Sequence, residues 1–249
     1  MKKNPKISVV TVTYNCVGVL ENTLKSVISQ KYSNVEYIVI DGKSSDGTLN
    51  LIDRYKDHIS ILVSEPDKGI FDAMNKAIKL VTGDWILFMN AGDTFVDDNV
   101  LASVFSLSVD SNVGVVFGDA YFKSKSGLSL YHGTPFYKKK ERYKGMGICH
   151  QSIFVRSDLA KLNPFNLSYK YTADYNMMMS IYNKGYKFLE TNIVISIYDL
   201  TGVSTLHCVD QFKEVYKICG LKKGTFLYYK LLITNKYREL KIKIKNLIV

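Results

Sequence analysis

The sequence predicts an α/β fold in which helices flank a mostly parallel sheet and a C-terminal amphipathic helical region follows. Two patterns support this prediction. Runs of β-branched residues alternate with apolar residues at helical spacing four times within about the first 90 residues, which is the pattern of right-handed βαβ units. From residue 209 onwards only helical spacing remains. We therefore expect one domain over residues 1–210 and a basic, amphipathic helical region over 211–249.

The elements of the first half are predicted from continuous apolar runs and the periodic segments between them. Continuous runs predict buried strands at 7–13, 35–40, 59–63 and 85–89. Apolar residues at helical spacing predict helices over about 19–28, 49–55 and 69–81. Polar or glycine-containing segments end each strand, so the polar side chains lie where strands pass into helices.

The pattern loosens in the second half. Strands are expected at 113–117, 128–131, 151–156 and 187–198, and a helix at 173–183. Helical spacing then continues from 209 to the end, without internal repeats or a linker-like run.

Composition and charge limit the classes of protein. The chain has 249 residues, 47% of them hydrophobic and 22% charged, which excludes collagen-like, low-complexity and disordered classes. The net charge of +10 indicates an anionic partner: a polyanion, an anionic membrane or a phosphorylated substrate. Four cysteines without CxxC spacing indicate free thiols in a cytosolic protein. No apolar run is long enough to cross a membrane.

Most of this charge lies in the last 29 residues, which hold eight basic residues and one acidic residue, Glu239. Apolar residues follow a single helical seam there: Ile233, Tyr237, Leu240, Ile244, Leu247 and Ile248. A basic helix with an apolar seam predicts binding to an anionic membrane surface. The alternative is a solvated or packing helix that closes the domain.

Ligands of open parallel sheets bind beyond the carboxyl ends of the strands. Here these ends are 13–15, 41–47, 65–68 and 90–93, and three of them carry a carboxylate. Neither GxGxxG after the first strand nor GxxxxGK[ST] occurs, which disfavours dinucleotide dehydrogenases and P-loop NTPases. Carboxylates instead suit a nucleotide site with a divalent ion. Taken alone, Asp41-Gly42 fits an ordinary turn, Asp93 a helix cap, and Asp72 and Asn75 the polar face of a surface helix.

Ordered motifs over roughly residues 5 to 210 resemble family 2 glycosyltransferases of the GT-A fold. Within that family they are similar to bacterial enzymes that build O-antigen or capsule repeat units on a lipid carrier. The motifs are SVVTVTYN at 8–15, DGKSSDGT at 41–48, EPDKGIFDAMNK at 65–76, TGDW at 82–85, NAGD at 90–93, CHQS at 149–152, ADY at 173–175 and TGVS at 201–204.

The resemblance implies a role for each matching position. Tyr14 and Asp41 would hold the uracil of a UDP-sugar, within a donor site made of Thr13, Tyr14, Asp41, Asp67, Lys68, Asp72 and Asn75. Asp93 would bind Mn²⁺ or Mg²⁺, although Gly92 and Asn90 stand where relatives carry further carboxylates.

The same resemblance makes Asp174 the catalytic base and places His150 and Gln151 beside the acceptor. The implied reaction is inverting transfer of a hexose from a UDP-sugar to a lipid-diphosphate-linked sugar, in β linkage to GalNAc or GlcNAc. The donated sugar, glucose or galactose, stays open. The enzyme is expected in the cytoplasm, peripheral on the inner face of the bacterial cytoplasmic membrane.

Two other classes of protein fit parts of this sequence. The charge and the 18 tyrosines suggest a nucleic-acid-binding protein, but the excess charge is confined to the C-terminal end and no recognition motif occurs. A sugar nucleotidyltransferase on a similar sheet would need a glycine-rich basic loop after the first strand, and residues 13–16 do not form one. We therefore expect no nucleic-acid partner.

Overall fold

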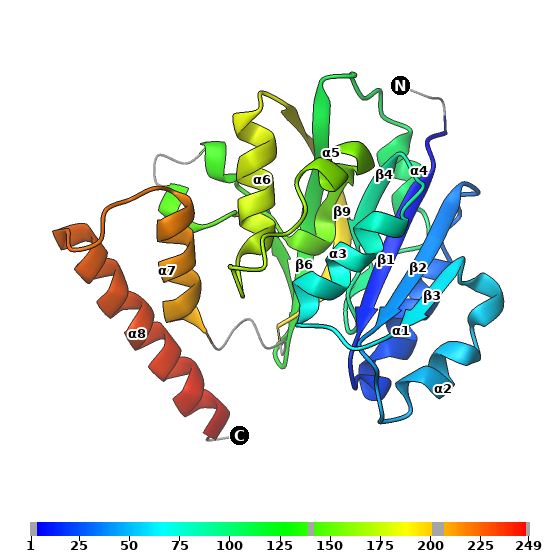
Figure 1. Ribbon diagram of the computed structural model, residues 1–249, viewed down its shortest axis with the longest axis horizontal. Coiled ribbons are helices and arrows are strands. Elements are labelled where there is room, and N and C mark those ends of the chain that lie inside the picture. The colour runs from blue at the N-terminus through cyan, green and yellow to red at the C-terminus, as the bar shows by residue number, and fades with distance from the viewer. Residues whose placement is uncertain (1–3, 139–141, 201–206, 248–249) are drawn as a thin grey trace.

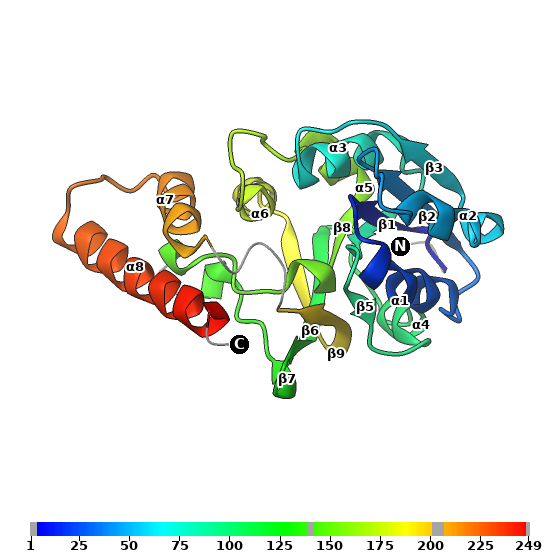
Figure 2. The same cartoon turned by 90° about the horizontal axis from the view of Figure 1, so that it is seen from below.

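The computed structural model describes residues 4–138, 142–200 and 207–247. Within these ranges one nine-stranded sheet has the order β3-β2-β1-β4-β8-β6-β9-β5, with β7 paired to β6. Helices cover both faces of the sheet, as Figure 2 shows. The predicted α/β class is therefore confirmed. The TGVS segment at 201–204 and Ile248 lie outside the described residues.

The first half of the sheet is parallel and follows the predicted alternation. Its strands are β1 (Ile7–Thr13), β2 (Val35–Asp41), β3 (Ile61–Ser64) and β4 (Trp85–Phe88). The helical segments between them are α1 (Val17–Ile28), α2 (Thr48–Asp53), a 3₁₀ turn (Lys56–His58) and α3 (Ile70–Leu80). Because these strands run in the same direction, their carboxyl ends meet at one edge.

Beyond β4 the sheet is mixed, since β8 runs antiparallel to both β4 and β6 whereas β6 and β9 are parallel. The remaining elements are β5 (Thr94–Phe95), α4 (Val100–Phe105), β6 (Val113–Ser124), β7 (Gly127–Tyr131), β8 (Ile153–Arg156), α5 (Ser157–Leu162), α6 (Ala173–Asn183) and β9 (Lys187–Asp199). The strand predicted at 151–156 begins two residues later, because His150–Ser152 forms a 3₁₀ turn.

Two apolar clusters hold the layers together. One lies between the sheet and α3, α5 and α6, with Met74, Leu159 and Met178 among its buried side chains. The other lies between the opposite face and α1, α2 and α4, with Leu24 and Trp85 among its members. The sheet is thus buried on both faces, and only its edges are left for a ligand.

The chain ends in α7 (Cys208–Ile218) and α8 (Phe226–Leu247), which lie beyond α6 at the end of the molecule opposite β3 (Figures 1 and 2). Rings of Phe212 and Tyr216 on α7 pack against Tyr228 on α8 with centroids 5.5 and 5.1 Å apart. Val215 of α7 belongs to the apolar cluster on the α6 side. No helix in the described part of the chain is long and apolar enough to cross a membrane. All four cysteines are free thiols.

Candidate active site

The predicted site residues gather at the edge where the parallel strands end. Tyr14 follows β1, Asp41 is the last residue of β2, Asp67 follows β3, and Asp93 lies in the turn after β4. This is where open α/β sheets bind ligands.

Asp41 is fully buried and fastens the loop that follows β2. Its Oδ1 accepts hydrogen bonds from Thr13 Oγ1 (3.0 Å) and Ser44 Oγ (2.5 Å), and its Oδ2 accepts from Ser44 N (3.0 Å) and Ser64 Oγ (2.7 Å). Burial raises the pKa of Asp41, but hydrogen bonds from Ser44 and Ser64 outweigh it and hold the pKa below its ordinary value. Asp41 is therefore a charged anchor that joins β1, β2 and β3.

The loops after β1 and β2 also lock each other. Asn15 N donates to Ser44 Oγ (2.8 Å), and Asn15 Oδ1 accepts from Ser45 N (2.9 Å). Asn15 and Lys43 both have left-handed backbone angles, with φ of 46° and 68°. Such conformations cost energy in non-glycine residues and persist only where the surrounding structure holds them. They are found most often at active sites and ligand-binding sites.

Gly42 leaves a narrow space between two predicted donor residues. A Cβ at this position would lie 2.5 Å from Asp67 Oδ2 and 3.2 Å from Tyr14 Cδ2. The Tyr14 side chain is 65% exposed, so its ring is available to a ligand. An exposed aromatic ring, a carboxylate and a bare backbone together suit a flat, hydrogen-bonding group such as a nucleobase.

The other three predicted donor residues, Lys68, Asp72 and Asn75, lie just before or within α3, and the side chains of Asp72 and Asn75 have partners within the protein. Asp72 Oδ2 accepts a hydrogen bond from Lys68 N (2.9 Å), and this bond closes the first turn. The Asn75 amide pairs with the backbone of Phe165, with N–O distances of 2.8 Å in both directions. Asn75 thus holds a distant loop against α3, while Lys68 is exposed.

Asp93 is a nearly buried carboxylate, 5% exposed. Its Oδ2 accepts from Gln151 Nε2 (2.8 Å), and its Oδ1 accepts from the backbone N of Asp199 at the end of β9 (3.0 Å). Burial raises the pKa of Asp93 to about 7, even though both hydrogen bonds lower it. A cation beside such a carboxylate would favour its charged form.

The residues around Asp93 fit a divalent cation that the donor helps to bind. Among the described residues no three His, Cys, Asp or Glu side chains form a metal cluster. Asn90, three residues before Asp93, has a buried Oδ1 without a hydrogen-bond partner within the described ranges. One carboxylate and one amide oxygen leave most of the coordination sphere to diphosphate oxygens and water, as Mg²⁺-type sites often do.

His150 and Asp174 form the second half of the site. His150 Nδ1 lies 3.4 Å from Asp174 Oδ2, and the two side chains are 16% and 21% exposed. The His150 ring packs against Phe88 and Phe165, with centroids 5.6 and 6.1 Å away. Its Nε2 is buried and has no hydrogen-bond partner in the part of the chain that the structure describes.

The adjacent residues His150 and Gln151 therefore each contact one predicted carboxylate: His150 contacts Asp174, the predicted base, and Gln151 contacts Asp93, the predicted metal ligand. Two contributors were not predicted. Cys149 Sγ donates to Gln151 Oε1 (3.3 Å) and so orients the amide. Asp199 directly follows the strand segment predicted at 187–198, so the rule on carboxylates at strand ends could have selected it.

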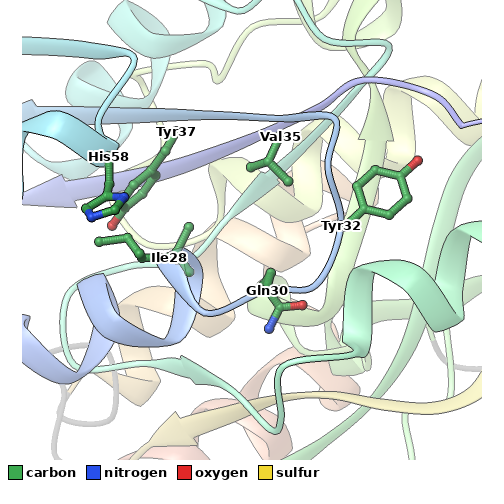
Figure 3. Close-up of a pocket in the computed structure, with 7 residues that line it drawn as sticks. Ile28, Gln30, Tyr32, Val35, Tyr37 and His58 are labelled. Carbon is green, nitrogen blue, oxygen red and sulfur yellow. The ribbon is translucent and has the colours of Figure 1, made fainter.

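A small pocket lies away from this edge. Its volume is about 130 Å³, and it lies between the end of α1 and the beginning of β2, lined by Val27, Ile28, Gln30, Tyr32, Val35, Tyr37 and His58 (Figure 3). It lies toward the start of the strands, whereas the predicted site residues lie at their carboxyl ends.

Comparison with known proteins places the sequence motifs in a family. The sequence model described as "Glycosyl transferase family 2" matches residues 8–171. The chain is 29% identical over 213 residues to a "PGL/p-HBAD biosynthesis glycosyltransferase" of Mycobacterium bovis, covering 83% of this chain and 82% of the relative. It is 25% identical to WfaP of Escherichia coli, named a UDP-Glc:alpha-D-GlcNAc-diphosphoundecaprenol beta-1,3-glucosyltransferase, over 88% of this chain and 86% of the relative.

Solved structures show the same fold at lower identity. S. aureus TarS 1–349 in complex with UDP superposes with a TM-score of 0.68 at 17% identity, over 95% of this chain and 72% of that one. This chain spans 38% of a longer TarS chain. A Pyrobaculum calidifontis mannosyltransferase in complex with GDP-Man and Mn²⁺ gives a TM-score of 0.65 at 18% identity, over 93% of this chain and 69% of that one.

Proposed function

Because this chain belongs to glycosyl transferase family 2, whose model covers residues 8–171, we propose that it is an inverting, UDP-sugar-dependent hexosyltransferase. The chain is a glycosyltransferase with the GT-A fold. Its proposed acceptor is GalNAc or GlcNAc linked to a lipid diphosphate, to which the hexose is joined in β linkage. This reaction would serve the synthesis of O-antigen, capsule or a related surface polysaccharide. Sugar transfer is favoured over nucleic-acid binding and nucleotidyl transfer by the family assignment.

The observation that carries the proposal is the contact of His150 with Asp174 and of Gln151 with Asp93. A displacement at a sugar carbon needs a base for the acceptor hydroxyl and positive charge for the departing diphosphate. The dipeptide His150–Gln151 contacts both the proposed base, Asp174, and Asp93, the proposed ligand of the cation that would supply this positive charge.

In the proposed mechanism Asp174 accepts the proton of the acceptor hydroxyl while that oxygen attacks the sugar C1 from the face opposite UDP. Tyr14 and Asp67 bind the nucleoside, whereas Asp41, which is fully buried and already accepts four hydrogen bonds, supports the site by keeping the surrounding loops in place through Thr13, Ser44 and Ser64. Asp93 and Asn90 would hold Mn²⁺ or Mg²⁺, which when bound neutralises diphosphate charge. Gln151 keeps Asp93 oriented.

The proposed acceptor and donor classes are supported by the name of one relative. WfaP is named for a UDP-Glc donor and a GlcNAc-diphosphoundecaprenol acceptor. Solved structures of the same fold contain UDP or Mn²⁺. We extend these classes to this chain, with glucose or galactose as the hexose.

The C-terminal helix supports a location at a membrane that carries such an acceptor. On one side of helix α8, Tyr228, Leu231, Leu232 and Glu239 are partly buried, and Glu239 Oε2 accepts a hydrogen bond from Val209 N of α7 (3.2 Å). Its opposite side exposes a stripe of apolar and aromatic side chains, each more than half exposed: Phe226, Tyr229, Ile233, Tyr237 and Leu240.

The exposed stripe has basic neighbours. Lys230, Lys236 and Lys241 border it at helical spacing, and Lys241 Nζ lies 4.6 Å from the Tyr237 ring centroid. An apolar stripe between lysines is the arrangement of helices that lie in an anionic membrane interface. We therefore propose that α8 attaches the enzyme to the inner face of the cytoplasmic membrane.

The proposed reaction is tested with a donor panel. The full chain is incubated with Mn²⁺, UDP-glucose, UDP-galactose or UDP-N-acetylhexosamines, and a synthetic GalNAc- or GlcNAc-diphosphate-lipid, followed by linkage analysis. We expect one hexose to be added in β linkage. Absence of transfer from every UDP-sugar would refute the donor class, and an α-linked product would refute inversion.

A further inference from the structure

Glu214 on α7 binds three consecutive backbone amides of the loop before α6. Its Oε1 accepts from Lys170 N (2.7 Å), and its Oε2 accepts from Tyr171 N (3.0 Å) and Thr172 N (3.0 Å). The Thr172 hydroxyl donates to the same Oε2 (2.9 Å). Four donors therefore converge on one carboxylate, and hydrogen bonds to an ionised acceptor are stronger than those between neutral groups.

This loop sets the start of the helix that carries the proposed base. Thr172 is the N-cap residue of α6, but its side chain makes no capping bond to the helix. Asp174 is the second residue of α6, two positions after the last amide that Glu214 binds. The backbone direction at Thr172 thus determines where the Asp174 carboxylate points.

Other contacts of α7 fall on the same stretch of chain. Lys217 Nζ lies 5.1 Å from the ring centroid of Tyr169, and the Tyr175 hydroxyl lies 3.6 Å from Cys219 Sγ. The Tyr171 ring stacks on His207, directly before α7, with centroids 4.8 Å apart. Among these residues Glu214 is the one that the hydrogen bonds above join directly to main-chain atoms of the loop.

We propose that Glu214 is a positioning residue for catalysis: it holds residues 170–172 so that Asp174 faces His150 and the acceptor hydroxyl. The proposal rests on the proposed role of Asp174 as the base. A general base must lie within hydrogen-bond reach of the proton it removes. A misplacement of about 1 Å by a distant substitution lowers rates by about 100-fold.

The test compares Glu214→Gln with Asp210→Asn in the full chain. Gln has the shape of Glu but lacks the charge and one acceptor oxygen. Asp210 is an exposed carboxylate one turn earlier on α7 whose ion-pair partner is Lys213 (3.1 Å), so its substitution controls for charge loss on this helix. We measure kcat and the donor KM for sugar transfer, UDP affinity by calorimetry, and amide hydrogen exchange over 170–176.

For Glu214→Gln we expect kcat to fall by about 10- to 100-fold, with donor KM and UDP affinity unchanged and faster exchange over 170–176. Asp210→Asn should behave as the wild type. An unchanged kcat would overturn the proposal. Parallel loss of kcat and UDP affinity would also overturn it, because it would show a general loss of structure. If the wild type transfers no sugar, the proposed function fails, and the exchange data alone decide whether Glu214 holds the loop.

Discussion

The Nδ1 atom of His150 lies 3.4 Å from Oδ2 of Asp174, so an imidazole contacts the proposed base, which lies at the start of α6. This contact and the Gln151–Asp93 hydrogen bond determine which substitutions separate proton transfer from donor binding.

Asp174→Asn should abolish most sugar transfer and leave UDP binding intact. The amide cannot accept the hydroxyl proton, and general bases contribute about 10²- to 10⁴-fold to rates. Steady-state kcat and UDP calorimetry measure the two effects. Asp158→Asn is a matched control because Asp158 is also the second residue of a helix, α5. Near-wild-type turnover of Asp174→Asn would remove Asp174 from the base role.

Asp93→Asn should weaken the combined binding of Mn²⁺ and UDP and lower activity. In the wild type, a hundredfold excess of ligand over Kd stabilises the fold by about 2.7 kcal/mol. Thermal unfolding should show that Mn²⁺ and UDP increase the stability of the wild type by this amount. The same ligands should increase the stability of Asp93→Asn much less. Asp98→Asn, at a surface carboxylate paired with Lys31, is the control. An identical increase in Asp93→Asn would exclude Asp93 as a metal ligand.

Gly42→Ala should reduce UDP affinity with little effect on stability. The added methyl would lie 2.5 Å from Asp67 Oδ2, so Asp67 and then Tyr14 must move away. A loss of about tenfold corresponds to one displaced polar contact of about 1.4 kcal/mol. Gly18→Ala is the control, because no atom lies within 4 Å of its new Cβ. Equal UDP affinity in both variants would contradict a nucleoside site at Gly42.

Glu36 predicts the acid dependence of stability. Burial raises the pKa of Glu36, but the opposing effect of the hydrogen bonds from Ser8 and Thr82 is larger. The resulting pKa is about 2. Because the pKa of Glu36 is lower in the folded state, its charge stabilises the fold fully at pH values above 4.5, the ordinary pKa. This stabilisation is lost as the pH falls through about 2, the pKa in the folded state.

Accordingly, Glu36→Gln should destabilise the fold by about 2 kcal/mol at neutral pH. The difference from the wild type should shrink as the pH falls from 4.5 toward 2. Urea unfolding of both chains across this range measures it. A difference that stays constant with pH would show that the charge of Glu36 is not involved.

Ile233→Asp should release the enzyme from anionic membranes. The substitution places a negative charge in the exposed stripe of α8, where the apolar surface is proposed to enter the lipid interface. Flotation with phosphatidylglycerol vesicles should recover the wild type and leave the variant in the dense fraction. Leu162→Asp, at an exposed leucine at the end of α5, is the control. Equal flotation of Ile233→Asp and wild type would reject α8 as the attachment.

The parts of the fold that the sequence predicts are those with local periodicity. The four parallel strands and α6 at 173–183 follow from apolar patterns. By contrast, β5 has two residues, too few for an alternation to repeat, and the sequence does not predict it or the short helices α4 and α5.

The sequence predicts candidate site residues one by one, but it does not predict the contacts between them. Asp93 and Gln151 are 58 positions apart, and Asn75 and Phe165 are 90 apart. Pairing over such distances arises from the order of the strands, in particular from the insertion of β8 between β4 and β6. From the sequence, Asn75 lies on the polar, solvent-facing side of α3. In the structure its amide instead hydrogen-bonds the backbone of Phe165 and holds that loop against the helix.

The hydrogen bonds from residues 170–172 to Glu214 have a consequence for the order in which the protein becomes structured during synthesis. Residues of the nucleoside-binding loops leave the ribosome early and find partners among themselves, as Asp41 does with Thr13, Ser44 and Ser64. The loop before α6 receives its carboxylate only when α7 has been translated, after every other residue of the site. We therefore expect the loop before α6, and with it the proposed base Asp174, to become ordered only once the C-terminal helices are present.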